Sequence, residues 1–155
     1  MNTRPHPACT PSTYFRRLLA IGAAALALLS GAALAQAAPF TAADEKSVRS
    51  VIESQLAAFA KDDAAKAFSF AAPNVREAVG SATAFMAMVR RDYPVVYRPA
   101  SVAFLKPDGK DDQAVQRVQM ADSSGASWLA VYSLERQGNK AWRIRRPWTA
   151  SRAPR

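Results

Sequence analysis

Residues 41–61 read TAADEKSVRSVIESQLAAFAK, and this stretch combines a helix start with the longest helical period in the chain. Thr41 stands three residues before Asp44, so its hydroxyl can cap free main-chain N–H groups while the acid opposes the positive end of the helix dipole. Apolar residues then recur at spacings of three and four, which predicts one buried stripe. We expect a sheet to pack on this stripe, with Val48, Ile52, Leu56 and Phe59 facing the sheet residues Val118, Val131 and Trp142.

The pattern changes from helices to strands near the middle of the chain. Asp62-Asp63 ends the first stripe and can cap a second segment, and Tyr93-Pro94 favours extended geometry. Helices are predicted over 64–72, 75–79 and 82–91, and strands over 95–98, 101–106, 114–120, 127–136 and 141–144. Successive hairpins indicate an antiparallel meander, so the sequence predicts an α+β class with N-terminal helices packed on an antiparallel sheet. Both faces of strand 127–136 are largely apolar, so the second face is expected to meet a partner or line a pocket.

The first residues have the three-part pattern of a signal peptide. Arg4, Arg16 and Arg17 precede the twelve-residue apolar run 18–29, and small residues follow around 33–37. The run is shorter than the ~20 apolar residues that span a bilayer. We therefore expect a signal peptide over 1–37, a single domain over 38–146, a basic tail over 147–155, and a periplasmic or secreted protein.

Removal of this leader changes the charge. Its three arginines reduce the basic residues from 21 to 18 against 12 acidic ones, so the formal charge falls from +9 to +6. Much of the rest lies at the C-terminus, in Arg143, Arg145, Arg146, Arg152 and Arg155. A nucleic-acid partner is not expected, because such binding needs a basic stripe on a folded face. The tail could contact an anionic envelope surface, or it could be a solvated terminus.

Several kinds of chemistry are excluded by residue types. The one cysteine, Cys9, and the one histidine, His6, lie in the predicted leader. The mature chain would therefore lack thiol nucleophiles, disulfides, histidine–cysteine zinc sites and Ser-His-Asp relays. The acids around Gly109 lack the ligand alternation of a calcium loop, so we expect no metal and no cofactor.

The richest candidate site is RRDYPVVYRP at residues 90–99, where helix and sheet are expected to meet. Its guanidinium and phenol groups could bind a ligand with an anionic group and an apolar body. They could instead form a structural corner in which arginine stems cover apolar surface. Tyr132 could contact a hydrophobic ligand beside Trp128 and Trp142, although aromatic residues at alternate strand positions more often form core. The predicted ligand-binding residues are Arg90, Tyr93, Tyr97, Arg98 and Tyr132.

The order of parts resembles the nuclear-transport-factor-like (SnoaL-like, cystatin-like) α+β roll, in which the sheet is curved. More closely, five strings resemble an exported bacterial family that is a domain of unknown function, numbered 4864. The strings are IExQLxAF at 52–59, FMAMVRR at 85–91, YPxxYRP at 93–99, VQRV at 115–118 and WLAxYxLER at 128–136. The resemblance covers residues 43–144 and implies the roll and export, but no activity. The chain departs from it at Arg145-Arg146-Pro147, where small or apolar residues would follow.

Two functional hypotheses remain open. The first is a non-catalytic domain of the cell envelope that binds a small anionic or hydrophobic ligand or has a structural role, with a homodimer as a further expectation. The second follows from the SnoaL-like resemblance, which implies an enzyme with a carboxylate and a tyrosine for proton transfer on a hydrophobic substrate. Asp92 or Glu135 would be that carboxylate.

The leader pattern predicts a mature chain that begins near Gln36 or Ala38. Intact mass measurement of the protein isolated from its native envelope should give the mass of the shortened chain. Recovery of the full-length chain, with residue 1 retained, would contradict the signal-peptide assignment.

Overall fold

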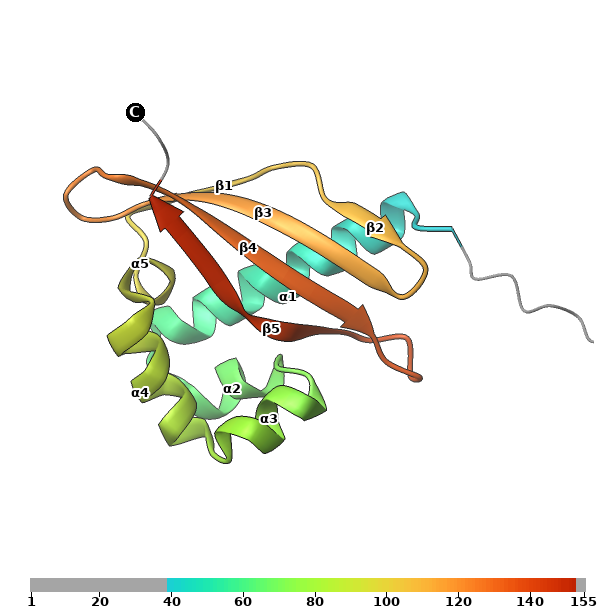
Figure 1. Ribbon diagram of the computed structural model, residues 1–155, viewed down its shortest axis with the longest axis horizontal. Coiled ribbons are helices and arrows are strands. Elements are labelled where there is room, and N and C mark those ends of the chain that lie inside the picture. Colours follow the sequence, from blue (N-terminus) through green and yellow to red (C-terminus); the bar gives the residue numbers. More distant parts are fainter. Residues whose placement is uncertain (1–38, 153–155) are drawn as a thin grey trace, which may run out of the picture. The chain divides into compact units, whose positions relative to one another are not determined.

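The computed structural model of the protein describes residues 39–152, and of residues 146–148 only the main chain. Within these residues, helices precede strands and pack on an antiparallel sheet, which confirms the predicted α+β class (Figure 1). The helices are α1 (Ala42–Ala60), α2 (Ala64–Ser69), α3 (Pro73–Val79), α4 (Ala82–Asp92) and α5 (Pro94–Tyr97). The strands are β1 (Ser101–Phe104), β2 (Asp108–Lys110), β3 (Gln113–Ala121), β4 (Ser127–Arg136) and β5 (Trp142–Arg152). The predicted signal peptide lies outside the described residues.

Helix α1 begins as its sequence predicts. The main-chain N–H of Asp44 donates to Thr41 Oγ1 at 3.2 Å, and the N–H of Thr41 donates to the Asp44 carboxylate at 3.0 Å. This reciprocal capping box satisfies two N–H groups that the first turn of the helix leaves free. α1 then lies across one face of the sheet, which we call the inner face (Figure 1).

The buried side of α1 differs from the prediction at one position. Val48, Ile52 and Phe59 are buried as predicted, whereas Leu56 is only half-buried. Gln55 is fully buried beside it, and its Nε2 donates to the main-chain oxygen of Ala67 in α2 at 3.1 Å. Because α2 packs along this part of α1, a polar side chain that finds a partner there is buried in place of the leucine.

The sheet has the strand order β1-β3-β4-β5, and β2 pairs with the first part of β3. Val118 lies opposite Ala130, and both are buried on the inner face. Val131 was predicted on this face, and that prediction is wrong. Successive strand side chains point to opposite faces, so Val131 lies on the outer face opposite Arg117.

Strand β5 is longer than predicted. The expected strand ended at residue 144, but β5 continues to Arg152, so residues 147–152 of the predicted tail are part of the sheet. The pairing with β4 passes through register shifts between Val131 and Leu134, which accommodate the Arg-Arg-Pro sequence. Pro147 has no N–H to donate, and it is tolerated because β5 is an edge strand. Residues 153–155 lie outside the described residues.

Two further segments differ from the prediction, one because of strand pairing and the other because of proline geometry. The predicted helix 64–72 ends at Ser69, because Phe70 and Ala72 exchange main-chain hydrogen bonds with Ile144 of β5 at 2.9 and 2.8 Å. The predicted strand 95–98 is instead the short helix α5, which begins at Pro94. Proline at the first helical position is pre-organised for a helix.

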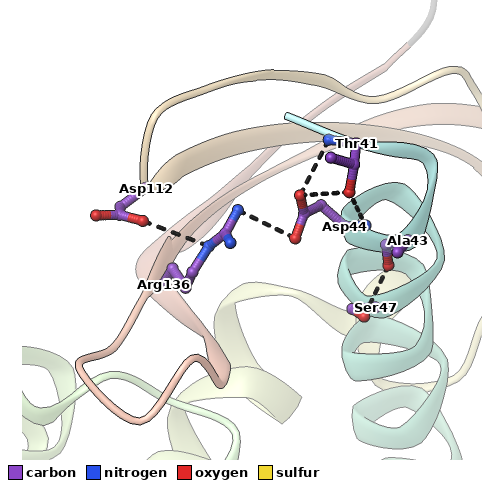
Figure 2. Close-up of polar contacts among 6 residues, drawn as sticks. All are labelled: Thr41, Ala43, Asp44, Ser47, Asp112 and Arg136. Atoms are coloured by element: carbon purple, nitrogen blue, oxygen red, sulfur yellow. Dashed lines mark hydrogen bonds and ion pairs between the residues drawn. The ribbon is translucent and has the colours of Figure 1, made fainter. Parts of the chain in front are cut away.

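Arg136 ties the start of α1 to the sheet, as Figure 2 shows. Its Nη2 lies 3.0 Å from Asp44 Oδ1, and its Nε lies 3.4 Å from Asp112 Oδ1. The guanidinium also lies 4.8 Å from the centre of the Trp142 ring. Phe40 packs edge-on against the same ring at 5.9 Å and directly against Gly109, where any side chain would collide with it.

Substitution of Ile52 by alanine should lower the free energy of unfolding by about 2–5 kcal/mol, because the side chain is fully buried and its removal leaves a cavity. Leu56→Ala should cost less, because Leu56 is half-buried. Urea unfolding followed by circular dichroism measures both, with the exposed Ser50→Ala as control. Equal losses for Ile52→Ala and Leu56→Ala would contradict the observed packing of α1.

Substitution of Asp44 by asparagine should make stability less dependent on pH in the acid range. The pKa of Asp44 is lowered from its ordinary value of 3.8, chiefly by hydrogen bonds from Thr41 and then by the charge of Arg136. A carboxylate with a lowered folded-state pKa stabilises the fold above its unfolded-state pKa, and this contribution is lost as the pH falls through the folded-state pKa. The stability difference between wild type and Asp44→Asn should therefore shrink as the pH is lowered from neutrality to below 3.8.

Urea unfolding at several pH values measures this difference. Asp111→Asn, in the exposed turn between β2 and β3, is the matched control. A wild-type advantage over Asp44→Asn that stays constant from neutral to acid pH would contradict the proposed role of the carboxylate.

Candidate functional site

Three of the predicted ligand-binding residues meet at the C-terminal end of α1. Arg90 lies in the last turn of α4, Tyr97 ends α5, and Arg98 follows it. All three side chains contact the carboxylate of Asp62, in the turn between α1 and α2. We call these four residues the Asp62 corner.

The Asp62 carboxylate receives a donor from each of the other three residues. Arg90 Nη2 lies 2.6 Å from Asp62 Oδ1, and the Tyr97 hydroxyl donates to the same oxygen. Arg98 Nη2 lies 3.0 Å from Asp62 Oδ2. The Tyr97 hydrogen bond is the main cause of a lowered pKa of Asp62, and the Arg90 hydrogen bond is the next. Asp62 is therefore held as an anion at the centre of the corner.

The corner carries one more positive than negative charge and is open to solvent. The guanidinium carbons of Arg90 and Arg98 each lie 5.1 Å from the centre of the Tyr97 ring. About half of each arginine side chain is exposed, at 49% and 58%. Two guanidinium groups thus share one internal carboxylate and keep donors that face water.

The other two predicted residues lie differently. Tyr132 is fully buried in the core, on the inner face of β4 opposite Gln116. Tyr93 joins α4 to α5 and packs, partly buried, against the core. Of the aromatic group beside Tyr132, Trp142 is also buried. The structure thus assembles Arg90, Tyr97 and Arg98 around Asp62 and places Tyr132 in the hydrophobic core.

Sequence reasoning missed Asp62 as a member of the site. The Asp62-Asp63 pair was interpreted as a helix break and a cap, and Asp63 does cap α2, since it accepts from the N–H of Lys66 at 2.9 Å. A helix cap needs only one of two adjacent acids, so the presence of a second acid is the signal that could have identified Asp62. Asp62 has a positive φ of 57°, a conformation in which aspartate and asparagine are enriched among non-glycine residues.

The carboxylates considered for proton transfer are engaged in surface ion pairs. Asp92 is held by Arg91 at 2.7 and 2.8 Å, and this contact lowers its pKa. Glu135 pairs with Arg145 at 3.3 Å.

Other carboxylates of the described chain are also held as anions. The pKa of Asp122 is lowered to about 2, chiefly by a hydrogen bond from the Ser124 hydroxyl. Asp92 and Asp122 are thus stabilised as anions, as are Asp44 and Asp62.

Most of the arginines near the C-terminal end of the described chain lie on the sheet. Arg143 and Arg145 alternate with the buried Trp142 and Ile144, so they face outward with Arg117 of β3. Arg152 lies over the ring of Trp128 at 5.8 Å. The sequence interpretation, in which the basic charge belongs to a tail, is wrong for these residues. They form part of a folded surface.

The acids of the β2–β3 hairpin line a hollow of about 470 Å³. Asp112, one of them, is already paired with Arg136. Within residues 39–152, histidine, cysteine, aspartate and glutamate do not gather in any group of three or more that could hold a metal ion.

Comparison with protein families gives one match. Residues 41–149 match the model of the family described as Domain of unknown function (DUF4864). The chain belongs to this family. No match was found among curated proteins or solved structures. The DUF4864 match confirms the family resemblance seen in the sequence, while the likeness to a nuclear-transport-factor-like roll stays a prediction.

The DUF4864 match covers α1 through most of β5, and so includes the whole Asp62 corner. In the part of the chain that the structure describes, none of the helices has the length and apolarity needed to cross a membrane.

Proposed function

We propose that this DUF4864 domain is an exported, non-catalytic binding domain of the cell envelope, and that it binds a small anionic ligand at the Asp62 corner. The observation that carries the proposal is that Arg90 and Arg98 both lie close to the Tyr97 ring and share a single, exposed carboxylate. The leader pattern supports export.

The chemistry of the corner favours a ligand with a carboxylate or phosphate and a flat or apolar body. A guanidinium group has five N–H donors, and Asp62 uses only some of those that Arg90 and Arg98 offer. A bound anion would take the remaining donors and balance the excess positive charge. Tyr97, whose ring centre lies 5.1 Å from each of the two guanidinium carbons, and the partly buried Tyr93 would contact the apolar part.

Proton-transfer catalysis is the less favoured alternative. A general base or acid works best with a pKa near the working pH, which for a carboxylate requires a raised value. The pKa values of Asp62 and Asp92 are instead lowered. The main cause is a hydrogen bond from the Tyr97 hydroxyl for Asp62 and from the Arg91 guanidinium for Asp92. Carboxylates that are held in the ionised form in this way are poorly suited to accept and return protons at neutral pH.

For a larger partner, the outer face of the sheet favours an acidic surface over a second copy of the chain. Val115, Leu129 and Val131 are half-buried there. Arg117, Arg143 and Arg145 lie on the same face, together with one acid, Glu135, which pairs with Arg145. In a two-fold dimer through this face, the same patch meets itself, so the arginines of the two copies would approach one another. An anionic envelope surface would instead be attracted to these charges.

The proposal predicts opposite effects of two substitutions on anion binding. Asp62→Asn should increase the affinity for phenylphosphate several-fold, because it removes a negative charge that competes for both arginines. Arg98→Ala should reduce the affinity. Asparagine also suits the positive φ at this position, so the turn is kept.

Titration with phenylphosphate, followed by NMR signals of the corner, measures both changes. Arg91→Ala is the matched control, because Arg91 is a neighbouring arginine that pairs with Asp92 outside the corner. If wild type, Asp62→Asn and Arg98→Ala all respond to phenylphosphate alike, the corner is a structural joint and the proposed binding role is wrong.

A further inference from the structure

Strand β1 forms an edge of the sheet, with β3 on one side and no described strand on the other. Phe104 lies opposite Val118, and the N–H of the next residue, Leu105, donates to the Arg117 oxygen at 3.0 Å. In an antiparallel ladder, the main-chain groups of alternate residues point toward the paired strand. Those of Leu105 point to β3, so the main-chain groups of Phe104 and Val102 point away from the sheet.

The same edge exposes apolar side chains. Val102 is 38% exposed and Leu105 is 43% exposed, and they are the exposed large hydrophobic residues of the described chain. Unpaired edges with exposed apolar residues are templates for another strand.

A groove of about 470 Å³ lies between this edge and the first turns of α1. Its positive charges are Lys46 and Arg49 of α1 and Lys106 of the β1–β2 connection, and its one acidic residue is Glu45. The remaining lining residues are Ala42, Phe104, Leu105, Pro107 and Gln116.

The wall of the groove is held in place by a buried side chain. Gln116 is 1% exposed, and its Nε2 donates to the main-chain oxygens of Leu105 at 2.6 Å and Arg117 at 2.8 Å. Arg49 lies 4.7 Å from the centre of the Phe104 ring and pairs with Glu53 at 2.8 Å. The edge and the basic rim are therefore fixed relative to each other.

We propose that the β1 edge and this groove bind an extended, acidic peptide segment of a partner protein, which adds to the sheet as an antiparallel strand. This site is separate from the Asp62 corner and does not depend on the function proposed for it. Main-chain hydrogen bonds would form with Val102 and Phe104, as in other cases of strand addition.

The geometry also determines which side chains of the partner segment face the groove. Residues directly opposite one another on antiparallel strands point to the same face. Phe104 points toward α1, where it meets Arg49, so the partner residues opposite Val102 and Phe104 point toward α1 as well. These residues should be acidic, because Lys46, Arg49 and Lys106 lie there.

Charge argues against two other occupants. Pairing of two copies through β1 would bring the lysines and arginine of both grooves together. The predicted leader carries arginines and no acidic residue, so its charge has the same sign as that of the groove. An acidic segment complements the positive charge of the groove, and its main chain can pair with the β1 edge.

The probe is the heptapeptide acetyl-TETETET-amide, in which the glutamates share one face of a strand. Its binding to the purified protein is followed by NMR, with a lysine-for-glutamate peptide as the charge control. We expect shifts of β1 and α1 signals with the acidic peptide only. Two N-methylated versions, one modified at the glutamates and one at the threonines, test main-chain pairing. In antiparallel addition the residues opposite Val102 and Phe104 donate to β1, so only methylation at the glutamates should abolish binding.

On the protein side, Val102→Pro removes an N–H that points away from β3, so the existing ladder is retained while the edge is blocked. This variant, and the double variant Lys46→Ala with Lys106→Ala, should each bind the peptide at least about tenfold more weakly. Lys61→Ala, at the other end of α1, is the matched control.

The proposal is overturned if the acidic peptide causes no shifts at millimolar concentration, or if the lysine peptide binds equally well. It is also overturned if Val102→Pro binds like wild type, or if both N-methylated peptides bind, because the interaction would then be a charge contact without strand addition. Light scattering that shows a dimer lost in Val102→Pro would assign the edge to a second copy instead.

Discussion

The ion pair between Asp44 and Arg136 is the contact on which the arrangement of helix and sheet depends. Both side chains are largely shielded from water, at 13% and 17% exposure, which distinguishes the pair from the surface ion pairs of the Asp62 corner. The guanidinium of Arg136 contacts the first turn of α1, the β2–β3 turn and the ring of Trp142 at the start of β5. Loss of one partner in a shielded pair leaves a charge without compensation, so the three segments are held together or released together.

This constraint sets the direction of α1 and thereby separates two basic sites. The groove beside β1 lies at the N-terminal end of the helix, and the Asp62 corner lies at its C-terminal end. Each site contains an internal acid, Glu45 in the groove and Asp62 in the corner. The difference is that Asp62 accepts directly from the arginines around it, whereas no described ion pair engages Glu45. In the groove, a ligand would compete with Glu53 for Arg49, whereas at the corner it would compete with Asp62 for both arginines.

Local features of the sequence predicted much of the fold, because capping, periodicity and turn residues act over a few positions. The capping box of Thr41 and Asp44 and the stripe of Val48, Ile52 and Phe59 are examples. The incorrect predictions share a different cause, because they concern contacts between residues that are far apart in the sequence. Asp62 contacts residues 28 to 36 positions away, and the burial of Gln55 depends on a carbonyl in α2. The extension of β5 across Pro147 required a bulge in its pairing with β4, which a run of Arg-Arg-Pro gives no reason to expect.

The two edges of the sheet are not equivalent, and this limits how the molecule can assemble. The β5 edge carries a proline, its pairing is bulged, and the segment between α2 and α3 already bonds to Ile144. The β1 edge is regular and directs free main-chain groups outward. A fibre that grows by strand addition needs two accepting edges on every copy. With one accepting edge, pairing of copies through that edge would end at a dimer, so strand addition would not extend into a fibre.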